Sequence, residues 1–343
     1  MKVCVPVVDA PQGGMYSFFR NFRKYLDGAA VSVTDDVEGD YDVLVANSWV
    51  VPEAVVARAK RRRPRLKVLH RIDGSAADYG RDAGADVRQA LVDLLADATV
   101  FQSAYGREVT RRRRIIACDG PIVHNAVDVD RFHPEGARLP LPGTVRLAHV
   151  AYSTNARKGA AAVFELARRR VDITFVMVGR YAAPPALPNI VMLGLADWER
   201  LPVILRSCTA LLTLSENEAC PNVVLEGLAS GLPVLYKASG GTPELVGACG
   251  AVVDVGTFDD ALAAVLARHS ELAEAARQRA QQRFAFGAVF PRYLDTVTQA
   301  TRRPLPGPAD YVRALGRLRA SPSTVARWLA SRARRAATPA ARA

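Results

Sequence analysis

The sequence predicts an α/β protein with two doubly wound parallel-sheet domains. With 343 residues, the chain exceeds one ordinary core and favours two domains of about 150 residues each. Short apolar runs alternate with amphipathic helical segments along most of the chain, which is typical of parallel sheets covered by helices. A stretch rich in proline and glycine, residues 136–144, divides this alternation into two series. We therefore expect two similar α/β domains joined by a linker.

The first series occupies residues 1–135, and its apolar runs are the expected strands. Parallel strands are near-continuous apolar runs because helices bury both faces of the sheet. The candidate strands are residues 2–8, 41–47, 67–73, 98–103 and 115–118. Helical patterns lie between them, so this part is predicted to form the N-terminal domain.

The second series occupies residues 145–285 and repeats the same alternation. Its candidate strands are residues 145–151, 173–179, 189–194, 210–215, 233–238 and 251–255. Pro221 suits the first position of a helix that Gly231 ends, which places Glu226 on the helix and Glu218 on the loop before it. Residues 258–280 are predicted to form one long helix. Residues 286–300 are expected to return to the first domain as a helix.

The net charge of +12 is concentrated at the C-terminal end of the chain. Residues 301–343 hold ten arginines and one aspartate, so the remaining 300 residues carry only +3. A nearly neutral body disfavours nucleic acid as a partner. In the arginine-rich tail, apolar residues recur at helical spacing beside arginines: Val312, Leu315, Val325, Trp328 and Leu329. Such helices can lie on anionic lipid, pack on the body or stay partly disordered.

The cysteine pattern and the hydropathy indicate the cellular compartment in which the protein works. Five cysteines are scattered without any C-x-x-C pair, which indicates free thiols and argues against a disulfide or zinc framework. No apolar run reaches the roughly 18 residues that a membrane span requires. Forty arginines against six lysines favour a bacterial genome of high GC content. We expect a cytoplasmic bacterial protein, with peripheral contact at the inner face of the cell membrane as an open alternative.

Four motifs together suggest a family. They are E-A-C-P-N-V-V-L-E (218–226), G-L-P-V-L (231–235), S-G-G-T-P-E-L-V (239–246) and V-H-N-A-V-D-V-D-R-F-H-P (123–134). In this order they resemble the retaining GT-B glycosyltransferases of glycosyltransferase family 4, over most of residues 1–300. The resemblance implies two Rossmann-like domains facing a cleft. It also implies transfer of a sugar from a UDP- or GDP-hexose type donor to a hydroxyl on a glycan, a glycolipid or a secondary metabolite.

The resemblance places the donor nucleotide in the second domain. It implies that Glu226 binds the ribose hydroxyls and that Glu218 binds the hydroxyls of the transferred sugar, since a carboxylate can accept two hydroxyl donors at once. Gly240 and Gly241 would let backbone amides approach the ligand closely. The other implied donor contacts are Ser153, Gly194, Pro221, Asn222 and Val223.

A diphosphate also needs cations. Lys158 before Gly159 matches the family pattern, but Tyr152 and Ser153 stand where the family has an arginine, so Arg157 is the candidate substitute. Gly13 and Gly14 resemble the glycine loop that closes over the donor. His70 and Asp73, at the end of a predicted strand, are with Glu218 the candidate catalytic residues. A core role for His70 is equally open.

Metal chemistry and two other functions are the alternatives. Asp128 and Asp130 form a D-V-D motif near the hinge, away from the donor loops. We therefore expect no metal and no other cofactor, because helix termini and Lys158 can neutralise a diphosphate. A nucleotide-sugar 2-epimerase has the same architecture, and a basic tail alone would suit a protein that binds nucleic acid or membrane surfaces. The expected partners are a nucleotide-sugar donor and an unidentified hydroxyl acceptor.

Overall fold

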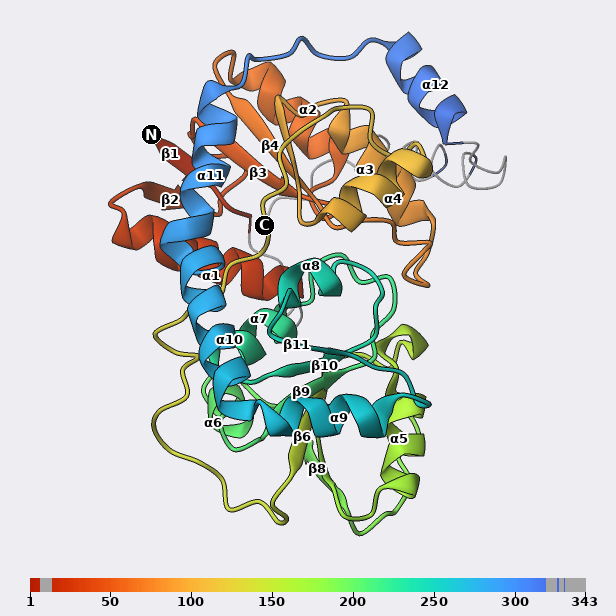
Figure 1. The fold of residues 1–343 in the computed structure, drawn as a ribbon. Helices are drawn as coiled ribbons and strands as arrows, with labels where there is room; N and C mark the ends of the chain where they lie inside the picture. The colour runs from red at the N-terminus through yellow and green to blue at the C-terminus, as the bar shows by residue number, and fades with distance from the viewer. Residues whose placement is uncertain (7–13, 319–325, 327–329, 331–343) are drawn as a thin grey trace.

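The computed structural model of the chain describes residues 1–6, 14–318, 326 and 330. Two separate sheets form two domains, one above the other in Figure 1, and every strand pairing in both sheets is parallel. This arrangement confirms the predicted pair of doubly wound domains.

The first domain is a five-stranded sheet with helices on both faces. Its order is β2-β1-β3-β4-β5. The strands are β1 (Lys2–Cys4), β2 (Ser32–Thr34), β3 (Val43–Asn47), β4 (Lys67–Ile72) and β5 (Ala98–Phe101). The helices are α1 (Gly14–Gly28), α2 (Glu53–Arg62), α3 (Gly84–Asp93) and α4 (Ala104–Arg112). One apolar core contains Phe18 and Phe22 of α1, and another contains Val56 of α2 and Val92 of α3.

The second domain is a six-stranded sheet of order β11-β10-β9-β6-β7-β8. Its strands are β6 (Arg146–Ala151), β7 (Thr174–Gly179), β8 (Ile190–Gly194), β9 (Ala210–Thr213), β10 (Val234–Tyr236) and β11 (Gly250–Val252). Its helices are α5 (Ala160–Arg169), α6 (Arg200–Leu205), α7 (Asn222–Ala229), α8 (Thr242–Val246), α9 (Phe258–Ala267) and α10 (His269–Arg283), and a short 3-10 turn, η1, spans Ala156–Lys158. Two apolar cores lie on the two faces of the sheet.

Three local predictions were wrong. Residues 115–118 form no strand, because Ile115 and Ile116 are buried in a small core cluster with Phe101 instead of pairing in the sheet. The short strand β2 was missed. The helix predicted over 258–280 is two helices, α9 and α10, because the backbone at Arg268 leaves helical geometry with φ −115° and ψ 23°.

The C-terminal part of the described chain packs on the first domain. Helix α11 (Phe286–Gln299) runs from the second domain alongside the first (Figure 1), and its Phe290 and Tyr293 join Phe18 and Phe22 in an aromatic cluster. Its proline, Pro291, lies inside the helix.

The first part of the arginine-rich tail belongs to the folded body. The backbone N–H of Arg303 donates to Asp97 Oδ1 at 2.6 Å, and the same carboxylate pairs with buried Lys60 at 2.8 Å. Helix α12 (Pro308–Arg317) then packs against α3, with Ala314 buried. The tail residues Val325, Trp328 and Leu329 lie outside the described residues.

Candidate functional site

Two cavities lie between the domains, where loops follow the carboxyl ends of strands from both sheets. The β4 cavity, of about 260 Å³, is lined by Asp73 and Gln102, which follow β4 and β5, and by the loop after β9. The β6 cavity, of about 270 Å³, is lined by residues that follow β6 and by the start of α7. Gly14, Arg81 and Glu218 line both cavities, so the two adjoin. Open α/β sheets bind ligands at this edge.

The β6 cavity collects seven of the residues that the sequence indicated. They come from both domains and from separate motifs: Gly14, Ser153, Lys158, Glu218, Asn222, Val223 and Glu226. Asn222 and Val223 are the first residues of α7, whose free N–H groups and dipole favour an anion. The cavity therefore combines a lysine, two carboxylates and a helix N-terminus.

Lys158 and Glu218 form a partly buried ion pair in this cavity. The Lys158 Nζ lies 2.6 Å from Glu218 Oε1. Burial opposes the charged lysine, but the charges and hydrogen bonds of Glu218 and Tyr79 together outweigh it, so the pKa of Lys158 is raised. The second oxygen of Glu218, Oε2, is buried and has no hydrogen-bond partner among the described residues. That oxygen is free to accept a hydrogen bond from a ligand.

The loop geometry explains the Lys-Gly pair in the sequence. Gly159 has φ +77°, and a Cβ there would lie 2.5 Å from the carbonyl oxygen of Leu214. Only glycine avoids both the strain and the clash. The close approach to the end of β9 keeps Lys158 beside the loop that carries Glu218.

Glu226 is buried on α7, with 7% of its surface exposed. Burial raises its pKa to about 7, against the opposing charges of Arg20 and Lys158. Arg20 comes from α1 of the first domain, and its guanidinium lies 3.2 Å from the ring centroid of Trp198. Sequence reasoning missed Arg20, because its relation to Glu226 depends on how the two domains meet.

Five of the predicted donor residues that the structure describes line neither cavity. Gly240 and Gly241 instead pack under the loop of Glu218: the Gly241 N–H donates to the Glu218 carbonyl at 2.9 Å, and a Cβ on Gly241 would lie 1.9 Å from the carbonyl oxygen of Ala219. Pro221 is the N-cap of α7, one position before its expected place. Gly194 ends β8 with φ +65°.

Arg157 is the fifth of these residues. Its Nη1 lies 2.7 Å from Glu216 Oε2, and Glu216 is shared with Lys237. The side chain is 42% exposed. The structure thus pairs Arg157 with a protein carboxylate at the surface.

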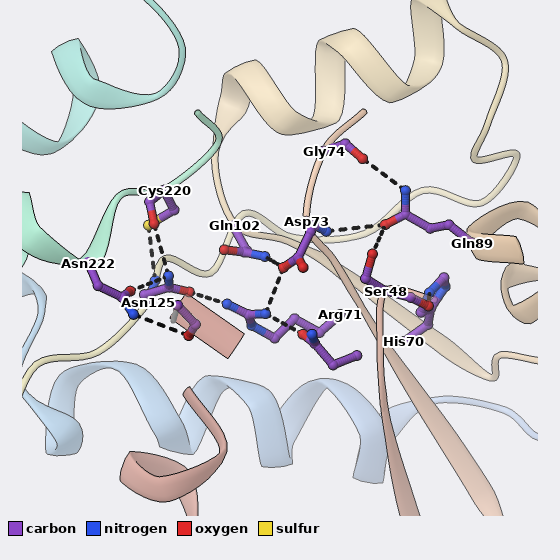
Figure 2. A network of polar contacts seen from close by, with 12 residues as sticks. Ser48, His70, Arg71, Asp73, Gly74, Gln89, Gln102, Asn125, Cys220 and Asn222 are labelled. Carbon is purple, nitrogen blue, oxygen red and sulfur yellow. Dashed lines mark hydrogen bonds and ion pairs between the residues drawn. The ribbon is translucent and has the colours of Figure 1, made fainter. Parts of the chain in front are cut away.

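A polar network lines the floor of the β4 cavity and connects the domains (Figure 2). Asp73 Oδ1 accepts hydrogen bonds from Gln102 and, at 3.0 Å, from buried Arg71. Arg71 also donates to Asn125. The Asn125 amide in turn donates to Asn222 Oδ1 at 2.6 Å, at the first residue of α7. The network therefore ties β4 of the first domain to the helix start in the β6 cavity.

His70 lies in the core and lines neither cavity. It is fully buried, its Nε2 is 3.0 Å from the carbonyl oxygen of Ser48, and its Nδ1 is 3.7 Å from Asp93 Oδ1. Burial would raise the pKa of Asp93, but the nearby His70 ring and the hydrogen bonds that Asp93 accepts from Thr99 and the Ala117 N–H together leave that pKa lowered. Of the candidate catalytic residues, Asp73 and Glu218 face the cavities. Gly13 lies outside the described residues.

Asp128 pairs with Lys24 at 2.6 Å, and with Asp130 it lines a separate hollow. Within the described part of the chain, no group of three or more His, Cys, Asp or Glu residues could hold a metal ion. All five cysteines are free. Among the described helices, none has the length and apolar character needed to cross a membrane.

Most of the second domain matches a known protein family. The family described as glycosyl transferases group 1 matches residues 149–271. No curated protein has a significant sequence match to this chain. Among solved structures, sucrose-phosphate synthase from Thermosynechococcus elongatus is similar with a TM-score of 0.70 at 16% identity, covering 86% of this chain and 96% of that one.

Two further structures share the architecture. HepE of Anabaena, in complex with UDP-glucose, has a TM-score of 0.70 at 13% identity and covers 87% of this chain and 99% of that one. The lipopolysaccharide outer core galactosyltransferase WaaB has a TM-score of 0.62 at 14% identity, with coverage of 87% and 99%. Identities this low establish the fold alone. The chain therefore has the two-domain GT-B fold, and the family match over its second domain supports a glycosyltransferase.

Proposed function

We propose that this protein is a retaining glycosyltransferase of family 4, which transfers a sugar from a nucleoside diphosphate sugar to an acceptor hydroxyl. The observation that carries the proposal is the β6 cavity, where Lys158, Glu218 and Glu226 meet the start of α7 beside Gly14 of the other domain. These residues come from distant motifs and share one cavity. HepE, of the same fold, is in complex with UDP-glucose, so UDP- and GDP-hexoses are the first donors to test.

Each charged group in the cavity suits one part of such a donor. Glu226, when ionised, can accept hydrogen bonds from both ribose hydroxyls. Lys158 and the N-terminus of α7 suit the diphosphate. The unpartnered Oε2 of Glu218 suits a hydroxyl of the transferred sugar. Asp73 lies in the adjoining β4 cavity, where it suits a hydroxyl of the acceptor or of the sugar.

In the proposed reaction, the bond from the anomeric carbon to the diphosphate oxygen breaks, and the acceptor oxygen bonds to that carbon on the same face. The acceptor proton passes to the departing phosphate oxygen, so no protein base is needed. The contribution of the protein is then to orient the sugar and to stabilise the negative charge on the leaving group. We propose that Lys158 and the α7 N-terminus do this without a metal ion.

We further propose that the protein works in the cytoplasm and contacts the inner face of the cell membrane through its basic tail. The free cysteines support a reducing compartment. On α12, Val312 is 70% exposed and the neighbouring Arg313 side chain is also 70% exposed. An exposed apolar residue next to a cation suits an anionic lipid surface.

Calorimetric titration with UDP, GDP, ADP and dTDP tests the donor site. One nucleotide should bind, and Lys158→Ala and Glu226→Ala should each weaken it by about tenfold or more. If no nucleotide binds, the proposal fails. Incubating the matching nucleotide sugars without any acceptor tests the epimerase alternative, because only an epimerase would convert the donor. Nuclear magnetic resonance of a transfer product gives its anomeric configuration, and inversion would refute retention.

A further inference from the structure

We infer that Arg81, on the first domain, supplies a cation to the donor diphosphate from across the cleft, in place of the arginine missing at residues 152–153. The inference rests on the proposed function. Arg81 lines the β6 cavity together with Lys158, and it also lines the β4 cavity. It follows β4 in sequence, far from the second-domain segment where the family resemblance places a phosphate-binding arginine.

The charges in the β6 cavity require such a residue. The charged side chains that line it are two cations, Arg81 and Lys158, and two carboxylates, Glu218 and Glu226. Lys158 is already paired with Glu218 at 2.6 Å. A diphosphate carries at least two negative charges, so Lys158 and the partial positive charge at the α7 N-terminus would leave it incompletely neutralised in a partly buried site. The cavity therefore needs a cation that no protein carboxylate holds.

Neither of the other arginines near the cavity meets this need. Arg157 is engaged by Glu216 at 2.7 Å. Arg20 is stacked on Trp198, and its charge acts on Glu226 at the deep end of the cavity.

Arg81 is held without being neutralised. Among the described residues it has no ion-pair partner within 4.0 Å. Its guanidinium instead lies 4.7 Å from the ring centroid of Tyr79 and 6.0 Å from that of Trp49. Aromatic faces attract a guanidinium while leaving its N–H donors free for a ligand. Arg81 thus keeps both its charge and its donors.

The backbone before Arg81 is fastened to the second domain beside Lys158. The Asn155 amide donates to the Tyr79 carbonyl at 3.0 Å, and the Asn217 amide donates to the Asp78 carbonyl at 3.0 Å. Gly80, with φ +75°, lies beside the second domain, where a Cβ would be in ordinary van der Waals contact with Arg157 Cγ at 3.6 Å. Asn155 is the N-cap of the turn that ends at Lys158. These contacts bring the Arg81 segment next to the lysine only when the domains are together.

A bound diphosphate would then contact cations from both domains. Arginine can donate two parallel hydrogen bonds to phosphate oxygens, which lysine cannot do in the same geometry. Because Arg81 borders both cavities, it lies where the leaving diphosphate and the incoming acceptor meet. Donor binding would accordingly favour the closed arrangement of the domains.

The test compares the affinity of purified variants for a nucleoside diphosphate and for its nucleoside. The wild-type chain is first titrated with UDP, GDP, ADP and dTDP, and the diphosphate that binds is carried forward with its matching nucleoside. Arg81→Gln should weaken the diphosphate by about tenfold or more and change the nucleoside affinity by less than about twofold. Arg81→Lys should lose less, because it keeps the charge. Arg65→Gln is the matched control, since Arg65 is exposed before β4, at the opposite edge of the same sheet.

The outcomes separate this inference from the proposed function. If one diphosphate binds the wild type and binds Arg81→Gln equally well, the Arg81 inference is wrong and the donor site stands. An equal loss of nucleoside and diphosphate affinity would also overturn it, because it would indicate a structural role. So would a loss in Arg157→Gln without one in Arg81→Gln. If no diphosphate binds the wild type, the proposed function fails and the inference fails with it.

Discussion

The raised pKa of Glu226 predicts that nucleoside binding depends on pH near neutrality. Glu226 is buried on α7, and burial raises its pKa to about 7. Only the ionised carboxylate can accept hydrogen bonds from two ribose hydroxyls, because the protonated form must use one oxygen as a donor. At low pH, a ligand that binds only the ionised carboxylate must therefore displace the proton from Glu226, which weakens binding.

The expected size follows from the ionised fraction. With a pKa of about 7, roughly one tenth of the Glu226 carboxyls are ionised at pH 6, one half at pH 7 and nine tenths at pH 8. If only this form binds, the association constant for the nucleoside rises by about tenfold from pH 6 to pH 8. His149, also buried in this domain, does not interfere, because burial lowers its pKa to about 4 and it stays neutral in that range.

The assay uses the nucleoside instead of the diphosphate, because a terminal phosphate titrates in the same range. Affinity is measured by calorimetry at several pH values for the wild type and for Glu226→Gln. The variant should bind more weakly than the wild type at pH 8 and show a flat profile. A flat wild-type profile, or an equal slope in the variant, would refute the assignment of Glu226 to the ribose.

The same pKa bears on folding stability. Because the pKa of Glu226 is raised from 4.5 to about 7 in the folded state, its contribution is most favourable below about pH 4.5 and is lost as the pH rises through 7. The total loss is about 3 kcal/mol, taking 1.36 kcal/mol for each pKa unit. In urea unfolding, the difference in stability between Glu226→Gln and wild type should therefore grow in favour of the variant from pH 5.5 to pH 8.5.

Three other changes have expected outcomes. Gly241→Ala places a Cβ 1.9 Å from a carbonyl oxygen of the loop that carries Glu218, so the donor affinity measured by titration should fall by about tenfold or more. The control is Gly287→Ala, whose Cβ would meet nothing within 4 Å, and it should leave the donor affinity unchanged. Glu218→Gln removes the carboxylate that pairs with Lys158, so the variant should bind a nucleoside diphosphate several-fold more tightly yet transfer sugar more slowly in a product assay. Deleting residues 319–343 should reduce co-sedimentation with vesicles of anionic lipid but not of neutral lipid; unchanged binding would exclude this segment as the membrane contact.

Most of the fold could be predicted because buried parallel strands are apolar on both faces. Strands such as β3 and β7 are entirely buried, and their sequences are correspondingly apolar. The missed strand β2 has only three residues, none of them fully buried, so it carries no such signal. The opposite error, a strand predicted where none forms, occurred at Ile115 and Ile116. These apolar residues are buried in a core cluster with Phe101 and are not part of the sheet.

The candidate site was predictable where residues belong to a motif on one loop. Lys158 ends η1, Glu218 lies on the loop between β9 and α7, and Glu226 lies on α7, so their places depend on the local geometry of the second domain. Arg20 and Arg81 come from the first domain, and their relation to the β6 cavity depends on the contact between domains. No local pattern marks them. The sequence also could not place His70, because a histidine in a strand can point into the core as readily as into a cleft, and His70 is buried in the core.

In the proposed donor site, the Lys158–Glu218 ion pair must open before the donor can contact both side chains. Each side chain is mostly buried, with 15% and 19% exposed, so each charge is compensated chiefly by the other. A nucleotide sugar can give both side chains a new partner, since its diphosphate can pair with Lys158 and its sugar hydroxyls can donate hydrogen bonds to Glu218. A nucleoside diphosphate without the sugar gives a new partner to Lys158 only, and Glu218 is then left without a cation. The pair therefore favours the complete donor over the product that remains after transfer, which would help release that product.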